Sequence, residues 1–196
     1  MKFTQIPANT FEELQLNAGV FLGGFNPADG TLGAEDILGA TTGGANFTDT
    51  ITYRDDGEDI DNCPKNTKEL KRVDTREIKI SGTYLTVNTA RAKSLIAAAD
   101  VDAADTTKIV PRDTLKDTDF EDLWWVGDYS DKNGETNGGY IAIHLINALS
   151  TGGFALQSGD KAKGQFAFTY TAHYSIKDPS KVPYEMFIKA GEEEAA

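Results

Sequence analysis

Residues 165–176 read QFAFTYTAHYSI, a stretch in which large apolar side chains alternate with small polar ones. Phe166, Phe168 and Tyr170 fall on one face of an extended chain, because successive residues of a strand point to opposite sides. This period of two predicts a β-strand with one buried and one polar face. At about 3.3 Å per residue, the strand would be about 40 Å long.

The same alternation recurs along the chain, so the sequence predicts a mainly β protein. Further strands are expected at residues 14–22, 47–54, 74–87, 109–110, 123–129 and 140–149. The segment 140–149 is apolar on both faces, which indicates a strand that is covered on both sides. Beyond Gly82 the apolar phase of the strand 74–87 changes, as a β-bulge at the glycine would cause.

Helical spacing is confined to one segment, from Ala90 to Asp100, which Thr89 can cap. Its apolar stripe consists of Ala92, Leu95, Ile96 and Ala99. Short helical turns are expected at Thr10 and Thr118, because each begins a Thr-x-x-Glu pattern typical of a capping box. Taken together, these elements predict an antiparallel β-sandwich or barrel with one flanking α-helix.

We expect a single domain over residues 1–196, interrupted by two long loops. Residues 23–45 contain seven glycines and Pro27, too many for a regular element, and loops of this length are usually functional or disordered. Residues 55–73 begin acidic and end basic, and they separate two predicted strands. Residues 190–196 are expected to form a flexible C-terminal tail.

The sequence shows no sign of a membrane or secretory segment. No run approaches the roughly 18 apolar residues that a membrane span requires. Residues 1–7 lack the charged-then-apolar order of a signal peptide. We therefore expect the protein to stay in the cytoplasm where it is made, or to be assembled there, without a membrane partner.

The charge balance is acidic, with 19 Lys and Arg against 31 Asp and Glu and a net charge of −12. The excess is local: residues 26–75 hold 11 acids and 5 bases, and residues 101–136 hold 10 acids and 4 bases. A nucleic-acid binder needs a basic stripe that displaces counterions from phosphates. No cluster of Lys or Arg is free of acids in this sequence, so we expect weak DNA binding.

Residue types suited to enzymatic or metal chemistry are few. The single cysteine, Cys63, excludes an internal disulfide and zinc sites built on paired cysteines, and no local pattern pairs it with His144 or His173. Gly159 and Gly164 have the spacing of a phosphate loop, but the lysine that must follow is missing. We expect no catalytic residue, no cofactor and no metal, and we predict that the protein is not an enzyme.

Trp124 and Trp125 are neighbours on a predicted strand, so one indole is expected on each face. One ring would belong to the core, and the other to the core or to a subunit contact. An alternative is a monomeric β-sandwich that binds carbohydrate, with the tryptophan pair as its stacking platform. Such a protein would bind sugars and remain a monomer.

Five segments, in order along the chain, share a further likeness. They are LQLNAGVFL (14–22), FNP (25–27), LWWVGDYS (123–130), GGYIAI (138–143) and GQFAFTY (164–170). Together they resemble the major tail tube proteins of long-tailed, siphophage-type bacteriophages. The resemblance covers almost the whole chain and rests on the character of the segments, without a catalytic signature.

The resemblance implies a structural virion protein whose copies form hexameric rings, each copy adding strands to a continuous inner barrel. Stacked rings would form the tail tube that conducts double-stranded DNA during ejection. The implied partners are other copies of the chain, the tape measure, terminator and distal tail proteins, and DNA in transit. The protein would be assembled in the bacterial host cytoplasm and located in the tail of the virion.

In that family the strands on either side of the second long loop contribute to the lumen. The candidate lumen-facing residues in this sequence are Thr48, Thr50, Thr52, Glu77, Lys79 and Ser81. We expect the second loop to reach a neighbouring ring, where the acidic end of one copy can meet the basic end of another. The candidate inter-ring residues are Asp55, Asp56, Glu58, Asp59, Asp61, Lys65, Lys68, Lys71 and Arg72.

Overall fold

The computed structural model describes residues 5–33, 36–130 and 138–192. Its strands are β1 (Gln15–Leu22), β2 (Thr41–Asp55), β3 (Lys71–Tyr84), β4 (Ala99–Val101), β5 (Ile109–Pro111), β6 (Glu121–Tyr129), β7 (Gly139–Ser150), β8 (Ala155–Gln157), β9 (Gln165–Ala172) and β10 (Tyr184–Lys189). The helices are α1 (Thr89–Ile96) and the 3₁₀ turns η1 (Thr10–Glu12), η3 (Lys68–Leu70) and η4 (Asp117–Asp119). The predicted mainly β class with one α-helix is confirmed.

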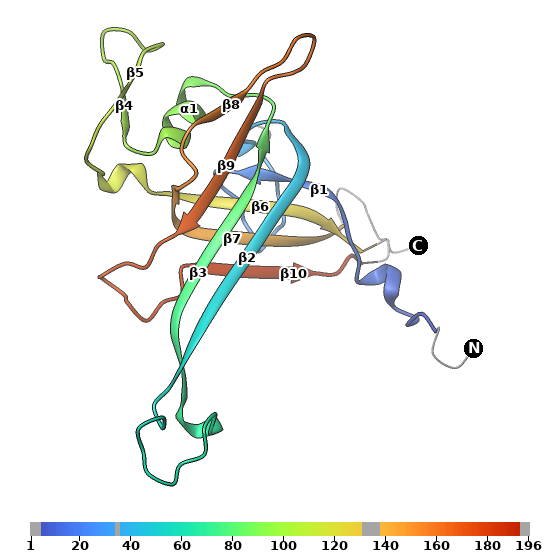
Figure 1. Ribbon diagram of the computed structural model, residues 1–196. Coiled ribbons are helices and arrows are strands. Elements are labelled where there is room, and N and C mark those ends of the chain that lie inside the picture. The colour runs from blue at the N-terminus through green and yellow to red at the C-terminus, as the bar shows by residue number, and fades with distance from the viewer. Residues whose placement is uncertain (1–4, 34–35, 131–137, 193–196) are drawn as a thin grey trace.

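Eight strands form one antiparallel sheet in the order β1-β6-β7-β9-β3-β2, with β10 added to β7 and β8 added to β9. Strand β7 pairs with β10 over residues 140–145 and with β9 over residues 148–150. Between these two partners, Asn147 has a φ of 51°. The sheet changes direction there, so β6, β7 and β10 cross β2, β3 and β9 in two layers (Figure 1).

The main core lies between the two layers, with Tyr84 and Tyr170 at its centre, both fully buried. Its members are Phe21, Ile78, Ile80, Tyr84, Leu95, Leu123, Trp125, Ile143, Leu145, Ala148, Phe168, Tyr170 and Ala172. A second, smaller cluster covers the other face of β6 and β7 and contains Leu22, Trp124, Tyr140 and Ala142. The predicted division of the two indoles between opposite faces is therefore confirmed, and β7 is covered on both sides.

The strand predicted over 165–176 is shorter than expected, because β9 ends at Ala172. The chain leaves the sheet there and forms a tight turn that is closed by a bridge between Ser175 and Asp178. Strands β8 and β10 were not predicted. β8 has only three residues, and the apolar residues of β10 do not alternate cleanly, so neither shows a clear period of two.

Both predicted loops are shorter than the sequence indicated. Residues 41–45 belong to β2, where Gly43 and Gly44 take φ values of 76° and 77° and form a bulge. The bulge expected at Gly82 therefore lies on the opposite strand, and β3 keeps its phase as far as Tyr84. The second loop loses its ends to β2 and β3 and forms the tip of a hairpin that joins them.

The helix prediction was right in place but wrong in its ends. Asn88 caps α1 by accepting a hydrogen bond from the backbone N–H of Arg91, and the helix stops before Ala99, which lies in β4. The expected short turns exist as η1 and η4, but neither Thr10 nor Thr118 caps them.

The chain ends lie partly beyond the residues that the structure describes. Residues 1–4 of the N-terminal segment and residues 193–196 of the predicted C-terminal tail are outside this range, and residues 190–192 follow β10 without regular structure. No helix in the described ranges is long and apolar enough to cross a membrane.

Candidate functional site, an exposed hairpin and its polar face

Strands β2 and β3 form a long hairpin that projects from the body of the protein (Figure 1). β3 pairs with β9 only over residues 79–84, so its residues 71–78 have no second neighbouring strand among the described residues. The outer edge of β2 has no partner strand in the described chain either. Unpaired edges attract further strands, and a two-stranded ribbon is only marginally stable in water. The hairpin is therefore suited to assembly with other chains.

All six predicted lumen residues lie on one face of this hairpin. Thr48 is the cross-strand partner of Lys79, and Thr50 is the partner of Glu77; directly opposed residues share a face. Strand β9 extends the same face. We call it the threonine face: Asn46, Thr48, Thr50, Thr52, Thr75, Glu77, Lys79, Ser81, Thr83, Thr169 and Thr171.

The threonine face carries almost no net charge although the whole chain is strongly acidic. Its two charged residues, Glu77 and Lys79, pair with each other at 2.7 Å. The hydroxyls bond partly among themselves, as Thr52 and Thr75 do at 2.5 Å. Hydroxyls can exchange hydrogen bonds with water, but they cannot replace the counterions of a phosphate backbone. The face is therefore polar and carries no unpaired cation in the described chain.

The opposite face of the hairpin is fixed to the body at its base. Asp49 on β2 forms an ion pair with Arg76 on β3 at 3.3 Å and accepts a hydrogen bond from the Tyr184 hydroxyl on β10 at 3.0 Å. Burial, together with the bond to Asp49, raises the pKa of Tyr184. The ring of Phe47 packs against the Tyr184 ring at 5.4 Å. This anchor could not be predicted, because β10 was missed in the sequence.

At the hairpin tip, one of the predicted inter-ring residues has an internal role. The Asp55 carboxylate accepts hydrogen bonds from the backbone N–H of Asn66 at 2.7 Å and of Gly57 at 3.0 Å. These bonds hold the pKa of Asp55 below its usual range. Asp55 therefore shapes the tip.

Opposite charges at the tip pair largely with each other. Asp56 contacts Arg54 at 3.0 Å and Arg72 at 4.0 Å, and Glu58 contacts Lys65 at 3.3 Å. Of the nine predicted inter-ring residues, those whose side chain forms neither an ion pair nor a hydrogen bond in the described chain are Asp59, Asp61 and Lys68.

The tip also exposes apolar side chains, which the charge pattern did not reveal. Tyr53 and Val73 are cross-strand partners, and both are more than half exposed, as is Ile60. Cys63 is half-buried beside Gly57 and Thr67. The contact surface that the tip offers is therefore apolar as well as charged.

The tryptophan pair does not form a sugar platform. Trp124 is 8% exposed and stacks on His144 at 4.0 Å, while Trp125 is 9% exposed and donates a hydrogen bond from Nε1 to the carbonyl of Ala18. A ring that stacks on a sugar needs a free face, and both indoles are covered. The carbohydrate-binding alternative therefore loses its structural basis. His173 packs near Phe120, and neither histidine lies beside Cys63.

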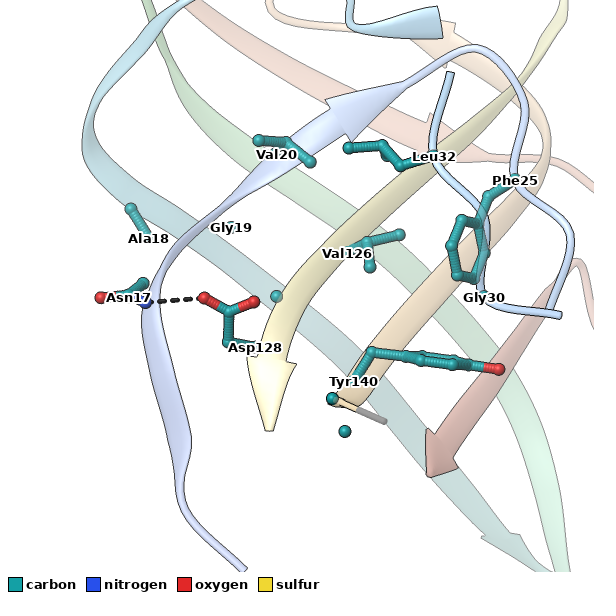
Figure 2. Close-up of a pocket in the computed structure, with 13 residues that line it drawn as sticks. Asn17, Ala18, Gly19, Val20, Phe25, Gly30, Leu32, Val126, Asp128 and Tyr140 are labelled. Carbon is teal, nitrogen blue, oxygen red and sulfur yellow. Dashed lines mark hydrogen bonds between the residues drawn. The ribbon is translucent and has the colours of Figure 1, made fainter. Parts of the chain in front are cut away.

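A pocket of about 650 Å³ opens between β1, β6 and the segment that follows β1 (Figure 2). Its walls include the apolar side chains of Val20, Phe25, Leu32, Val126 and Tyr140, and the polar side chains of Asn17 and Asp128. No pattern in the sequence predicted this pocket.

The pocket owes its shape to an irregularity in β1. The register of β1 against β6 shifts between Leu16 and Val20, where Asn17 and Gly19 have φ values of 62° and 68°. A Cβ atom at Gly19 would lie 2.6 Å from the Trp125 ring, so only glycine fits there. At the mouth, the Asn17 amide donates a hydrogen bond to Asp128 at 2.7 Å.

Comparison with known proteins does not assign the chain to a family. No protein-family model matches the sequence, and no curated protein matches it. Among solved structures, a chain from the virion of a native gene transfer agent particle is similar, with a TM-score of 0.42 and 6% identity, over 88% of this chain and 96% of that chain. A likeness of this size carries no conclusion about the fold or function of this protein.

Proposed function

We propose that this protein is a structural virion component whose copies close into hexameric rings, and that the rings stack into a tail tube that conducts double-stranded DNA. The observation that carries the proposal is the β2–β3 hairpin, which projects from the body with both edges open over most of its length. Closing such edges against neighbouring copies in a barrel removes them. We therefore expect this chain to form closed rings, in which these strand edges are paired with neighbouring copies.

In such a ring the threonine face would line the channel. Its opposite face bears Ile78 and Ile80, which are buried in the core of each copy, so only the threonine face is free to point toward the axis. The channel wall would then consist of hydroxyls with one neutralised ion pair per copy. A wall of this kind gives DNA phosphates no unpaired cations to bind.

The tip of the hairpin would contact the next ring. It is the most distant part of the hairpin from the body (Figure 1) and exposes Tyr53, Ile60 and Val73 together with the unpaired charges of Asp59, Asp61 and Lys68. Proposed partners beyond the chain itself are the tape measure, terminator and distal tail proteins.

The proposal is tested by electron microscopy of the purified protein together with its mass in solution. We expect rings with sixfold symmetry, or tubes built from them, and a ring mass of about 127 kDa from six chains of 21.2 kDa. Concentrated protein and seeding with preformed rings should drive stacking. A protein that remains a monomer under all of these conditions would contradict the proposed function.

We expect the purified protein not to retard duplex DNA in a gel at micromolar concentration, because the threonine face lacks net charge. Replacing Thr48, Thr50 and Thr52 by lysine should create DNA retention that disappears as salt is raised. A matched control adds the same charge to the loop between β4 and β5, through Ala103→Lys, Ala104→Lys and Thr106→Lys. Salt-sensitive retardation by the unmodified protein would show that the face binds DNA after all.

A further inference from the structure

Ile176 is the most exposed large apolar side chain in the described ranges, at 96%. It is the second residue of the tight turn Ser175–Asp178 after β9, at the tip of the turn. The backbone N–H of Asp178 donates a hydrogen bond to the carbonyl of Ser175 at 3.1 Å. The Ser175 hydroxyl also accepts a bond from the N–H of Lys177 at 3.2 Å. Glycine, asparagine, aspartate or proline usually occupies such a tip. An isoleucine there contributes nothing to the core of its own copy.

The turn presents Ile176 in a fixed position. Two hydrogen bonds close it, and Pro179 follows directly. A side chain that is already ordered loses little freedom when it binds. Ile176 therefore has the properties of an anchor residue for contact with a partner surface, because it is both exposed and held in place.

The pocket described above is the apolar hollow that could receive this side chain. Val20, Leu32 and Val126 line it, and Leu32 is itself 48% exposed (Figure 2). The pocket volume of about 650 Å³ is larger than the volume of one isoleucine side chain, so the tip of the turn can enter together with Ile176. One pair of opposite charges is available for this contact, because the exposed Asp128 stands at the mouth and Lys177 is next to Ile176.

The anchor and the pocket lie at opposite ends of the same strand. Ile176 borders a surface hollow together with Asn147, near the end of β7, whereas Tyr140, near the start of β7, lines the pocket. Seven residues of strand at about 3.3 Å each separate these ends by about 23 Å. A copy therefore cannot fill its own pocket, but a neighbouring copy can.

We propose that Ile176 of each copy inserts into the pocket between β1 and β6 of the next copy around the ring. The inference rests on the proposed function and deepens it by naming the contact between neighbouring subunits. A contact between different surfaces of two identical chains is head-to-tail, and such contacts generate rings when the rotation closes. The second copy is thus the occupant that both the geometry and the charges favour.

Cross-linking tests this contact in the assembled protein. In a background with Cys63→Ser, the pair Ile176→Cys and Leu32→Cys is oxidised with diamide, which takes up the two electrons and two protons that the thiols release. We expect covalent oligomers that increase by one subunit up to the hexamer. Each single variant should give no such series, and neither should the pair of Ile176→Cys with Leu156→Cys on β8, where Leu156 is 55% exposed against 48% for Leu32.

The outcomes separate this proposal from the function on which it rests. Rings in the microscope without the oligomer series would overturn the contact and leave the proposed function intact. An absence of rings in the unmodified protein would overturn the proposed function. A product that stops at the dimer would show a symmetric contact and also contradict the head-to-tail arrangement.

A substitution gives an independent measure. Ile176→Asp should raise the protein concentration at which rings form by about 10- to 100-fold, the effect of losing one buried aliphatic side chain at each contact. The circular dichroism spectrum should not change, because the side chain is exposed in the monomer. Leu156→Asp is the matched control. If Ile176→Asp assembles at the same concentration as the unmodified protein, the contact does not exist.

Discussion

Shortening the β2–β3 hairpin is expected to abolish tubes while leaving single rings. Thr52 and Thr75 are cross-strand partners, so replacing residues 53–74 by Asn-Gly joins them through a two-residue turn that suits a hairpin. The change removes every predicted inter-ring residue and the exposed Tyr53, Ile60 and Val73. The remaining β2 edge from residue 45 to residue 52 is unchanged, so ring closure should survive.

The loss of tubes is expected to be large because the tip contact is repeated on every copy in the ring. An exposed ion pair contributes only about 0.2–1 kcal/mol, and a half-exposed apolar side chain contributes a similar amount. Each contact recurs on six copies, so small terms add up to the difference between stacked and separate rings. Electron microscopy and sedimentation measure the loss, and circular dichroism checks that the β-structure persists.

A charge-only variant separates the two contributions at the tip. Asp59→Lys with Asp61→Lys reverses two charges that have no ion pair in the described chain and leaves the apolar side chains in place. We expect shorter tubes and not a complete loss of tubes.

The shortened protein has an outcome that would contradict the role of the tip. If it forms tubes of normal length, the stacking contact lies in residues 23–40 or in the C-terminal segment.

Strands with a strict period of two could be predicted from the sequence because their pattern reports burial directly. Most of β9 follows this rule, and so does the side-by-side placement of Thr48, Thr50 and Thr52 on one face. β6 and β7 instead have apolar residues on both faces, and both strands are covered on both sides. That these threonines stand opposite Glu77 and Lys79 depends on register, and the register shifts at two bulges, one in β2 and one in β3. Such shifts are decided by local backbone geometry that alternation does not encode.

The missed features depend on contacts between distant segments. The charges at the hairpin tip looked free for a neighbour, but the turn brings Asp56 beside Arg54 and Arg72. The pocket depends on the positive φ values of Asn17 and Gly19. Asn and Gly two residues apart within an alternating strand are a signal for a bulge, and that signal could have found the pocket.

A buried polar cluster around Arg91 gives the second large effect that we expect. Arg91 lies in the first turn of α1, and its side chain is only 9% exposed. Its Nη1 donates to Glu121 at 2.8 Å and to the Tyr170 hydroxyl at 3.2 Å. Burial is the largest single effect and lowers the pKa of Arg91, but Glu121, Tyr170 and Tyr84 together outweigh it, so the pKa lies above its usual value. The cluster ties α1 to β6 and β9.

Replacing Arg91 by methionine should lower the free energy of unfolding by about 3 kcal/mol, because Glu121 loses the cation that compensates its partial burial. For a chain of this length the melting temperature should fall by about 6–12 °C. Urea denaturation of the monomer at low concentration measures the change. The double variant Arg91→Met with Glu121→Leu should recover most of the loss, because removing both partners leaves no unpaired charge.

Arg54→Leu is the matched control, since Arg54 is also paired with a carboxylate but its side chain is 60% exposed. Its cost should stay below about 1 kcal/mol. The contrast between the two arginines tests burial as the cause, because the shortest ion pairs lost are of similar length, 2.8 Å from Arg91 to Glu121 and 3.0 Å from Arg54 to Asp56. Arg54 also loses a longer pair, to Asp74 at 3.9 Å. Equal costs for Arg91→Met and Arg54→Leu, or no recovery in the double variant, would mean that the Arg91 cluster does not hold the helix to the sheet.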